Sequence, residues 1–450
     1  MFTEDWDKLT PDQRYEERMK AWFATEAGIP FVSDEVRDAW RERVQMLRDV
    51  IELRKPKRVP VLPMGGFFAA QYSGLTAREL YYDYPKAQDA YLKVNADFDF
   101  DGAFSTFAGV FPGEMYDILD LKLVSWPGHG TGDDAPFQYN EKEWMKDDEY
   151  DLLLRDPSDY WQRVYLPRIF GALEPWSMLA PFTDIWEPPI NVPTFFPFSL
   201  PPMQQMLEKL VKAGEAAGRW IMGPGAVDGQ VAAAYGRPGF FGGAAKAPYD
   251  ILGDTLRGTR GIMLDKFRRP EKVLEACERL VPLAIDQGRR GCDFTKVPIV
   301  FMPLHKGADG FLSDADFHKF YWPTLKAVIK GLIDEGLVVW LFAEGGYDTR
   351  LQAIAESDIP RGRTVWLFDA TDMKEVKRHL GGFQCFAGNV PGGLLIAGTP
   401  ADVDDYVKRL IADVAGDGGY LLAPGVVTDE AKPECVRAMI EAGKRYGAQI

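Results

Sequence analysis

The chain has 450 residues, 46% of them hydrophobic and 13% aromatic, which supports a large core and excludes a disordered protein. Its formal net charge of −15 at pH 7 argues against nucleic acid as a partner, because phosphate binding needs a basic surface. Cys277, Cys292, Cys385 and Cys435 lack metal-binding spacing, and no stretch reaches the ~18 apolar residues of a membrane span, so we expect a cytoplasmic protein with free thiols.

Residues 1–55 predict a helical extension outside the main fold, which we place at residues 56–450. Thr10 and Gln13 fit a capping box with Pro11 in the first turn, and Ser33 is the expected start of a second helix. Buried strands are then expected at residues 58–64 and 100–105, each a short apolar run.

Residues 108–215 do not fit a repeating strand–helix unit. Their proline-rich segment at 188–202 excludes a regular helix or a central strand. We interpret 108–215 as an insertion of helices and loops that covers one end of the fold. A third strand is expected at 218–223, and the glycine-rich residues 223–261 predict a mobile lid over an active site.

The clearest pattern lies between residues 297 and 348. An apolar run ends in His305 and Lys306, a helix capped by Ser313 follows, and a second apolar run ends in Glu344. A strand–helix–strand crossover of this kind implies parallel strands. Later strands are expected at 364–368, followed by Asp369, and near 383 and 420.

Eight strands with helices between them predict an α/β protein, a (β/α)₈ TIM barrel, whose chemistry lies at the carboxyl ends of the strands. The candidate catalytic residues are therefore Glu344, His305, Lys306 and Asp369, with a structural role as the alternative for each. Zinc held by Glu344 and His305 is a less favoured possibility. The turn after the seventh strand supplies the candidate cofactor-binding residues, Asn389, Gly392 and Gly393.

The chain resembles the uroporphyrinogen decarboxylase superfamily, which also contains cobalamin-dependent methyltransferases. The likeness is carried by DTLRGTRGIMLDKFRRPEKVLEACERL at 254–280, AGNVPGGLL at 387–395, GTPADVDDYVKRLIADV at 398–414 and GGYLLAPG at 418–425. This resemblance implies a (β/α)₈ barrel, often dimeric, with its site at the carboxyl ends of the strands.

Two motifs of the superfamily are altered. The decarboxylases have arginines after the first strand, where this chain has Gly65 and Ala69, and the positions of their aspartate and histidine are Thr106 and Val426. A polyanionic tetrapyrrole would lack its bidentate partners here.

The methyltransferases that resemble this chain hold zinc with a His-x-Cys motif and a later cysteine. The matching residues here are Phe342, Glu344 and Val426, so a zinc–thiolate site like theirs is not expected.

The sequence thus predicts a methyltransferase component. It would move a methyl group between a small methylated substrate and a cobalamin carried by a partner corrinoid protein, and the resemblance favours a homodimer. One alternative is a decarboxylase or lyase acting on a small acid through Lys306 and Glu344, which three or more basic groups in the pocket would favour. The other is a non-catalytic binding protein, which a barrel mouth filled by residues 186–202 would favour.

Overall fold

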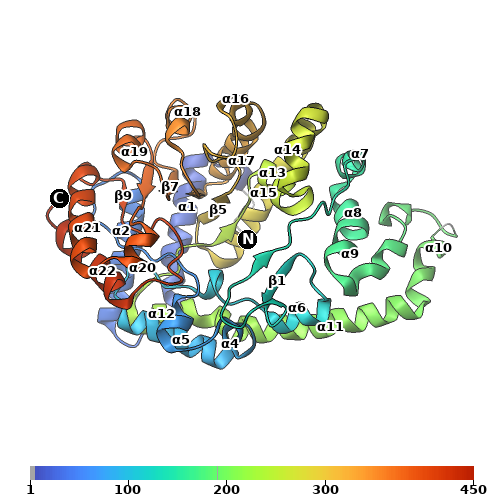
Figure 1. The fold of residues 1–450 in the computed structure, drawn as a ribbon, viewed down its shortest axis with the longest axis horizontal. Coiled ribbons are helices and arrows are strands. Elements are labelled where there is room, and N and C mark those ends of the chain that lie inside the picture. The colour runs from blue at the N-terminus through green and yellow to red at the C-terminus, as the bar shows by residue number, and fades with distance from the viewer. Residues whose placement is uncertain (1–5, 190) are drawn as a thin grey trace.

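The computed structural model describes residues 6–189 and 191–450. At its centre is a parallel sheet with the strand order β4-β5-β6-β7-β8-β9 (Figure 1). The strands are β4 (Gly243–Ala244), β5 (Ile299–Leu304), β6 (Val338–Ala343), β7 (Thr364–Phe368), β8 (Cys385–Ala387) and β9 (Tyr420–Leu421).

Two extended segments, near residues 61 and 101, join the edges of this sheet and close it. The backbone N–H groups of Leu62, Asp101, Ala103 and Gly242 donate to the carbonyls of Leu422, Val61, Pro238 and Ile299, respectively, at 2.8–2.9 Å. Six strands and two extended segments therefore form the predicted (β/α)₈ barrel.

The third wall segment is residues 238–244, so the strand expected at 218–223 is wrong. Residues 218–222 instead end α11 (Pro201–Met222), and the side chains of Ile221 and Met222 are 60% and 80% exposed. A short apolar run between glycines can belong to a strand or to a helix end, and sequence periodicity does not separate the two.

The glycine-rich region also differs from the expected lid, because it supplies part of the barrel wall. A Cβ atom added at Gly242 would lie 1.9 Å from the carbonyl oxygen of Val297, and one at Gly243 would lie 2.4 Å from that of Gly288. These glycines let β4 lie directly against the start of β5 and against α15 (Pro270–Thr295). They serve close packing rather than opening.

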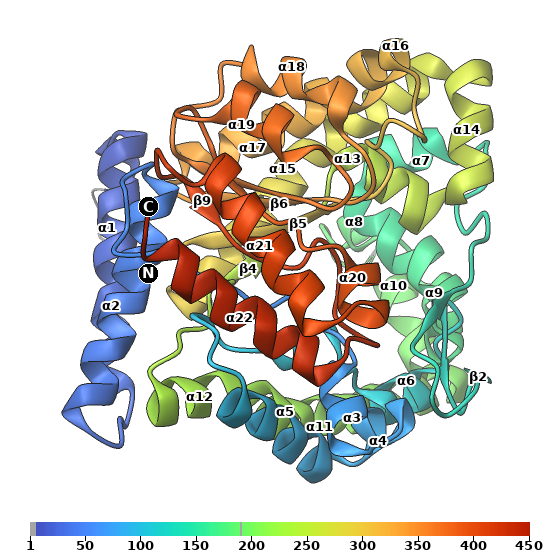
Figure 2. The same ribbon diagram turned by 60° about the vertical axis from the view of Figure 1, so that its left-hand side comes forward.

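Strand alternation directs one set of side chains into the barrel. Trp340, Cys385 and their inward neighbours share one buried cluster with Trp22 and Trp40 of the N-terminal helices α1 (Pro11–Ala24) and α2 (Asp34–Ile51). These two helices lie side by side against the barrel (Figure 2). The predicted capping box at Thr10 and the N-cap at Ser33 are both confirmed.

Helices cover the outer face of the barrel (Figure 2). Ser313 caps the crossover helix as predicted. The helices of the N-terminal and C-terminal parts are α3 (Phe68–Ser73), α4 (Ala77–Tyr82), α5 (Tyr84–Asp97), α12 (Val227–Tyr235), α13 (Pro248–Asp250), α14 (Gly258–Arg268), α16 (Asp314–Asp316), α17 (Trp322–Asp334), α18 (Leu351–Ala355), α19 (Met373–Leu380), α20 (Gly392–Ala397), α21 (Pro400–Val414) and α22 (Pro433–Gly447).

Residues 108–215 lie mainly to one side of the barrel (Figure 1). They contain a small sheet of β1 (Val124–Pro127), β2 (Gly130–Thr131) and β3 (Gln138–Tyr139), and the helices α6 (Gly113–Leu119), α7 (Tyr150–Arg155), α8 (Pro157–Tyr160), α9 (Leu166–Ile169) and α10 (Val192–Phe195). Within the described residues, no helix has the length and apolar character needed to cross a membrane.

Candidate functional site

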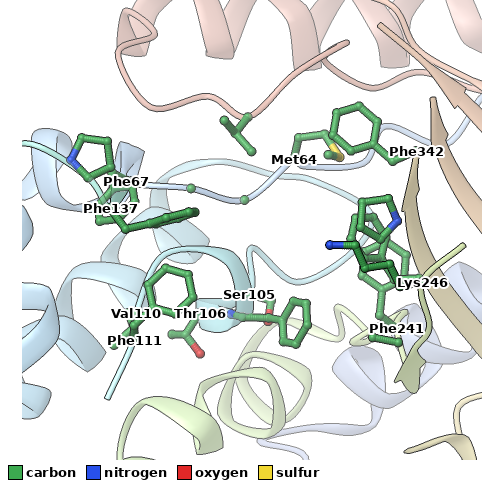
Figure 3. A pocket seen from close by; sticks show the side chains of 18 of the residues that line it. Met64, Phe67, Ser105, Thr106, Val110, Phe111, Phe137, Phe241, Lys246 and Phe342 are labelled. Carbon is green, nitrogen blue, oxygen red and sulfur yellow. The ribbon is translucent and has the colours of Figure 1, made fainter. Parts of the chain in front are cut away.

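A cavity of about 1140 Å³ lies at the carboxyl ends of β5 and β6. His305 and Lys306 follow β5, and Glu344 follows β6, so the barrel contributes polar groups to one wall. Phe137 and Glu141, from the insertion, line another part of the cavity. Figure 3 shows Phe67, Phe111 and Phe137 on one side of the open space and Phe241 and Phe342 on the other.

Three basic side chains converge on Asp254. Its Oδ2 atom lies 2.6 Å from Nδ1 of His305 and 2.8 Å from Nζ of Lys246, and its Oδ1 atom lies 3.1 Å from Nζ of Lys306. Burial opposes ionisation of Asp254, but the hydrogen bond from His305 and the charge of Lys246 hold its pKa well below the usual range. Asp254 is therefore a carboxylate that orients all three cations.

His305 bridges two carboxylates. Its Nδ1 atom contacts Asp254, and its Nε2 atom lies 3.6 Å from Oε1 of Glu344. Burial alone would lower the pKa of His305, but the hydrogen bond to Asp254 and the nearby carboxylate of Glu344 outweigh it and raise the pKa to about 10. His305 is thus an imidazolium at neutral pH, with its Nε2 proton beside Glu344 at the cavity wall.

Asp250 fixes the loop that presents this histidine. It is fully buried and accepts hydrogen bonds from the backbone N–H groups of His305 and Lys306, at 3.1 and 2.9 Å, and from the hydroxyl of Tyr321, at 2.8 Å. Burial and the charge of Asp254 raise the pKa of Asp250 to about 6. Its contacts are with the loop itself, which indicates a positioning role.

Together these groups form a proton donor held at fixed geometry. A carboxylate on Nδ1 sets the orientation of the imidazolium and leaves Nε2–H as the group that can be given away. The arrangement suits protonation of a leaving atom in the cavity.

The family model described as Uroporphyrinogen decarboxylase (URO-D) matches residues 235–446, which include Asp254, His305 and Glu344. This part of the chain is therefore similar to the uroporphyrinogen decarboxylase superfamily. No curated protein sequence matches the chain significantly.

Two solved structures are similar to this chain over part or most of its length. A methyltransferase from Methanosarcina mazei has a TM-score of 0.55 at 12% sequence identity, over 89% of this chain and 98% of that one, and this likeness shows the shared fold. A B12-independent methionine synthase from Shewanella sp. W3-18-1, in complex with selenomethionine, has a TM-score of 0.31 at 12% identity, over 46% of this chain and 60% of that one. That second likeness carries no argument.

The residues that replace the two URO-D superfamily motifs have ordinary structural surroundings. Phe342 and Gly65 line the cavity, and the hydroxyl of Thr106 donates to the carbonyl of Pro224 at 2.9 Å. Val426 lies against Gly392, where an added Cβ would approach its Cγ2 atom to 2.6 Å. Among the residues that the structure describes, no three His, Cys, Asp or Glu side chains are grouped as metal ligands.

The other candidate residues separate into two groups. Lys306 lies with His305 and Glu344, where its Nζ atom also donates to the hydroxyl of Thr259 at 2.8 Å. Asp369 does not line the cavity; its Oδ2 atom accepts from the N–H of Gly345 at 3.0 Å, and burial raises its pKa. Asp369 therefore shapes the turn that carries Glu344.

The candidate cofactor-binding residues also lie outside the cavity lining. The side-chain amide of Asn389 donates to the carbonyls of Asp369 and Thr371, at 3.0 and 2.9 Å. Gly392 and Gly393 begin α20 and do not reach the cavity. Asn389 holds the turn after β8 and is committed to protein contacts.

Sequence reasoning missed three acidic and basic residues of the site. Asp250 ends α13 and Asp254 lies in the helical turn that follows it, at residues 251–256, whereas Lys246 follows the two-residue strand β4, which the sequence does not reveal. Their spacing of four residues is the available signal, because residues four apart lie on one face of a helical turn. Asp254 also begins the longest motif of the URO-D resemblance.

Asp228, on α12, was missed as well; it lines the cavity but belongs to a helix and does not follow a strand. Its Oδ1 atom is shielded from solvent and makes no hydrogen bond within the described structure. Burial raises the pKa of Asp228 to about 6, against the opposing hydrogen bond from Ser105.

Proposed function

We propose that this chain is the substrate-binding methyltransferase component of a corrinoid-dependent system. The observation that carries the proposal is the imidazolium of His305, held by Asp254 and facing a largely apolar cavity. The shared fold with a methyltransferase supports it. A homodimer and a cytoplasmic location remain predictions from the sequence.

The methyl acceptor in this proposal is a reduced corrinoid that belongs to a partner protein and enters as a second substrate. The described residues offer no three-ligand metal group, and the cavity is lined mainly by apolar side chains. The role of this chain is therefore to hold the donor, exclude water and supply a proton.

The transfer is balanced with the groups named. The bond between the methyl carbon and its heteroatom breaks, and its electron pair stays on the heteroatom, which takes the Nε2 proton of His305. The methyl group passes to the reduced corrinoid of the partner protein, which supplies the electron pair for the new bond. General acid catalysis of this kind is typically worth about 10²–10⁴-fold.

The test is to follow consumption of free cob(I)alamin by its absorbance, with the purified chain and a panel of methanol, trimethylamine, dimethyl sulfide and methoxybenzene. We expect turnover with at least one donor, and loss of about 10²–10⁴-fold in His305→Ala and Glu344→Gln. The side chains of His305 and Glu344 are 32% and 43% exposed, and in both variants Asp254 still pairs with Lys246 and Lys306. The thermal midpoints of the variants should therefore stay within a few degrees of that of the native chain.

His318→Ala is the matched control, since His318 is a half-exposed helix residue that is paired with Asp314 and does not line the cavity. It should retain full activity. Turnover that survives in both site variants, or that is absent with every donor, would contradict the proposal.

The alternative is a carboxy-lyase acting on a small acid, and one observation favours it. Three basic groups, Lys246, Lys306 and His305, line the cavity. All three contact Asp254, however, and the cavity holds five carboxyl groups, on Glu141, Asp228, Asp254, Glu344 and Asp429. A carboxylate substrate would thus meet cations that are already paired. Release of CO₂ from small acids would favour the lyase.

The other alternative is a non-catalytic binding protein, which would be favoured if residues 186–202 filled the mouth of the barrel. The described residues of that segment do not line the cavity. The open space at His305 is therefore available to a substrate.

A further inference from the structure

The cavity is much larger than the smallest methyl donors require. Its volume of about 1140 Å³ compares with about 30 Å³ for one water-sized molecule, so methanol would occupy a small part of it. Its size is slightly above the range of about 300–1,000 Å³ that is typical of pockets for drug-sized organic ligands. The cavity therefore suits a substrate in which the methyl group is attached to a larger organic group.

Two sets of phenylalanines face each other across the cavity. The outer wall is Phe67, Phe111 and Phe137, and the barrel wall is Phe241, Phe301 and Phe342. Ring centroids lie 5.1 Å apart for Phe111 and Phe137, and 4.9 Å apart for Phe241 and Phe301, so each wall is a packed aromatic surface. Figure 3 shows open space between the two. A flat ring would cover apolar surface on both of its faces there.

The charged groups around the cavity do not favour a substrate with an anionic ring system. Of the residues that the structure describes, no arginine is part of the lining, and the lysines are paired with Asp254. Carboxylate and phosphate recognition by a bidentate fork is therefore missing. A neutral aromatic body fits what is present.

The acidity of His305 indicates which atom of the substrate carries the methyl group. A methylated ammonium leaves as a neutral amine and needs no proton at the moment of transfer, whereas an aryl ether leaves as a phenolate. Phenols have an ordinary pKa of about 10, which matches the pKa of about 10 that Asp254 and Glu344 give His305. Proton transfer between the two is close to thermoneutral, which favours an oxygen leaving atom over a nitrogen one.

We propose that the substrate is an aromatic methyl ether, with its ring between the outer wall and the barrel wall and its ether oxygen at Nε2 of His305. This inference rests on the proposed function and specifies its substrate class. The O–CH₃ bond breaks with its electron pair left on oxygen, oxygen takes the His305 proton to give the phenol, and the methyl group goes to the reduced corrinoid.

Binding is tested first, without turnover. Isothermal titration calorimetry of the full chain compares methoxybenzene with methoxycyclohexane, which has the same methoxy group and similar size but no aromatic ring. Because each aromatic contact adds a preference beyond buried area, we expect methoxybenzene to bind about tenfold more tightly.

Variants of the two walls assign that preference. Phe137→Leu and Phe241→Leu keep an apolar side chain and should each remove most of the preference for the aromatic probe. Phe294→Leu is the matched control, because Phe294 is 89% exposed, and it should keep the full preference. Equal affinity for the two probes, or an unchanged preference in both wall variants, would overturn the proposal.

Methyl transfer to free cob(I)alamin then tests the leaving atom, with methoxybenzene and methylthiobenzene as donors. His305→Ala should lower the rate from the ether and leave the rate from the thioether nearly unchanged, because an aryl thiolate is a much weaker base than a phenolate and leaves readily without an acid. Equal losses for both donors would refute the ether assignment.

The two proposals fail in different ways. A ten-fold aromatic preference without any methyl transfer would contradict the function and keep the binding of an aromatic body. Transfer from methanol or trimethylamine with no aromatic preference in binding would keep the function and refute the substrate class.

Discussion

At the scale of single residues, Asp254 sets the protonation state of His305. The folded-state pKa of His305 is about 10, so the acid form persists through neutral pH and is lost only as pH rises through about 10. We expect the alkaline limb of the kcat profile near that pH. In Asp254→Asn the main partner of Nδ1 loses its charge, and the limb should move more than one pH unit downward, toward the ordinary imidazole value of about 6.5.

The measurement is the pH dependence of kcat for both proteins between pH 6 and 10.5. Asp151→Asn is the control, since Asp151 is 80% exposed and pairs with Lys272 on the surface. An alkaline limb that stays near pH 10 in Asp254→Asn would show that another group controls the reaction.

Asp228 destabilises the folded chain at neutral and higher pH. Its folded-state pKa of about 6 lies above the ordinary aspartate value of about 3.9, so folding takes up a proton, and stability falls as pH rises from 4 through 6. Asp228→Asn removes this cost. We expect the variant to be more stable than the native chain by about 1–3 kcal/mol at pH 8 and by much less at pH 4, measured by urea unfolding at both values. An equal effect at the two pH values would contradict the assignment.

At the scale of elements, the glycines of β4 are required for packing. A Cβ atom at Gly243 would meet the backbone oxygen of Gly288 at 2.4 Å and Sγ of Cys292 at 3.2 Å. Because α15 cannot retreat without leaving the barrel, Gly243→Ala should destabilise the chain by about 1–3 kcal/mol in denaturant unfolding.

Gly218→Ala is the matched control for this substitution. Gly218 lies within α11, and an added Cβ would meet nothing within 4 Å. The change should be neutral or stabilise by up to about 1 kcal/mol. If the two alanine variants had the same stability, β4 would not be packed as described.

These elements also show what could be predicted from the sequence. The crossover from 297 to 343 was found because its strands and helix are long, periodic and capped, and the rule that chemistry follows parallel strands then placed His305 and Glu344. Asp254 was missed because it lies in a helical turn, at residues 251–256, rather than at the end of a strand, and reaches the site only through tertiary packing. The third wall segment was missed because its two-residue strand has glycine where a periodic signal would be.

At the scale of the whole molecule, the cavity exists only if the barrel is closed. The outer wall follows the first two extended segments, whereas His305 and Glu344 follow β5 and β6. Asp101 joins the first two segments: it is fully buried and accepts from Nη1 and Nη2 of Arg58, at 2.6 and 2.5 Å, and from the N–H of Val61 at 2.8 Å.

Asp101→Ala should therefore act on stability and binding together. It leaves the Arg58 guanidinium without its partner beside a buried backbone donor, a loss of about 3–5 kcal/mol in the free energy of unfolding. We also expect weaker binding of methoxybenzene, since the outer wall would no longer be held at a fixed distance from the barrel wall. Urea unfolding and calorimetry of the same preparations measure the two effects.

Asp97→Ala, which removes an exposed partner of the Tyr72 hydroxyl, is the control and should leave both stability and binding unchanged. A large loss of stability with full binding would mean that the two walls are held together elsewhere.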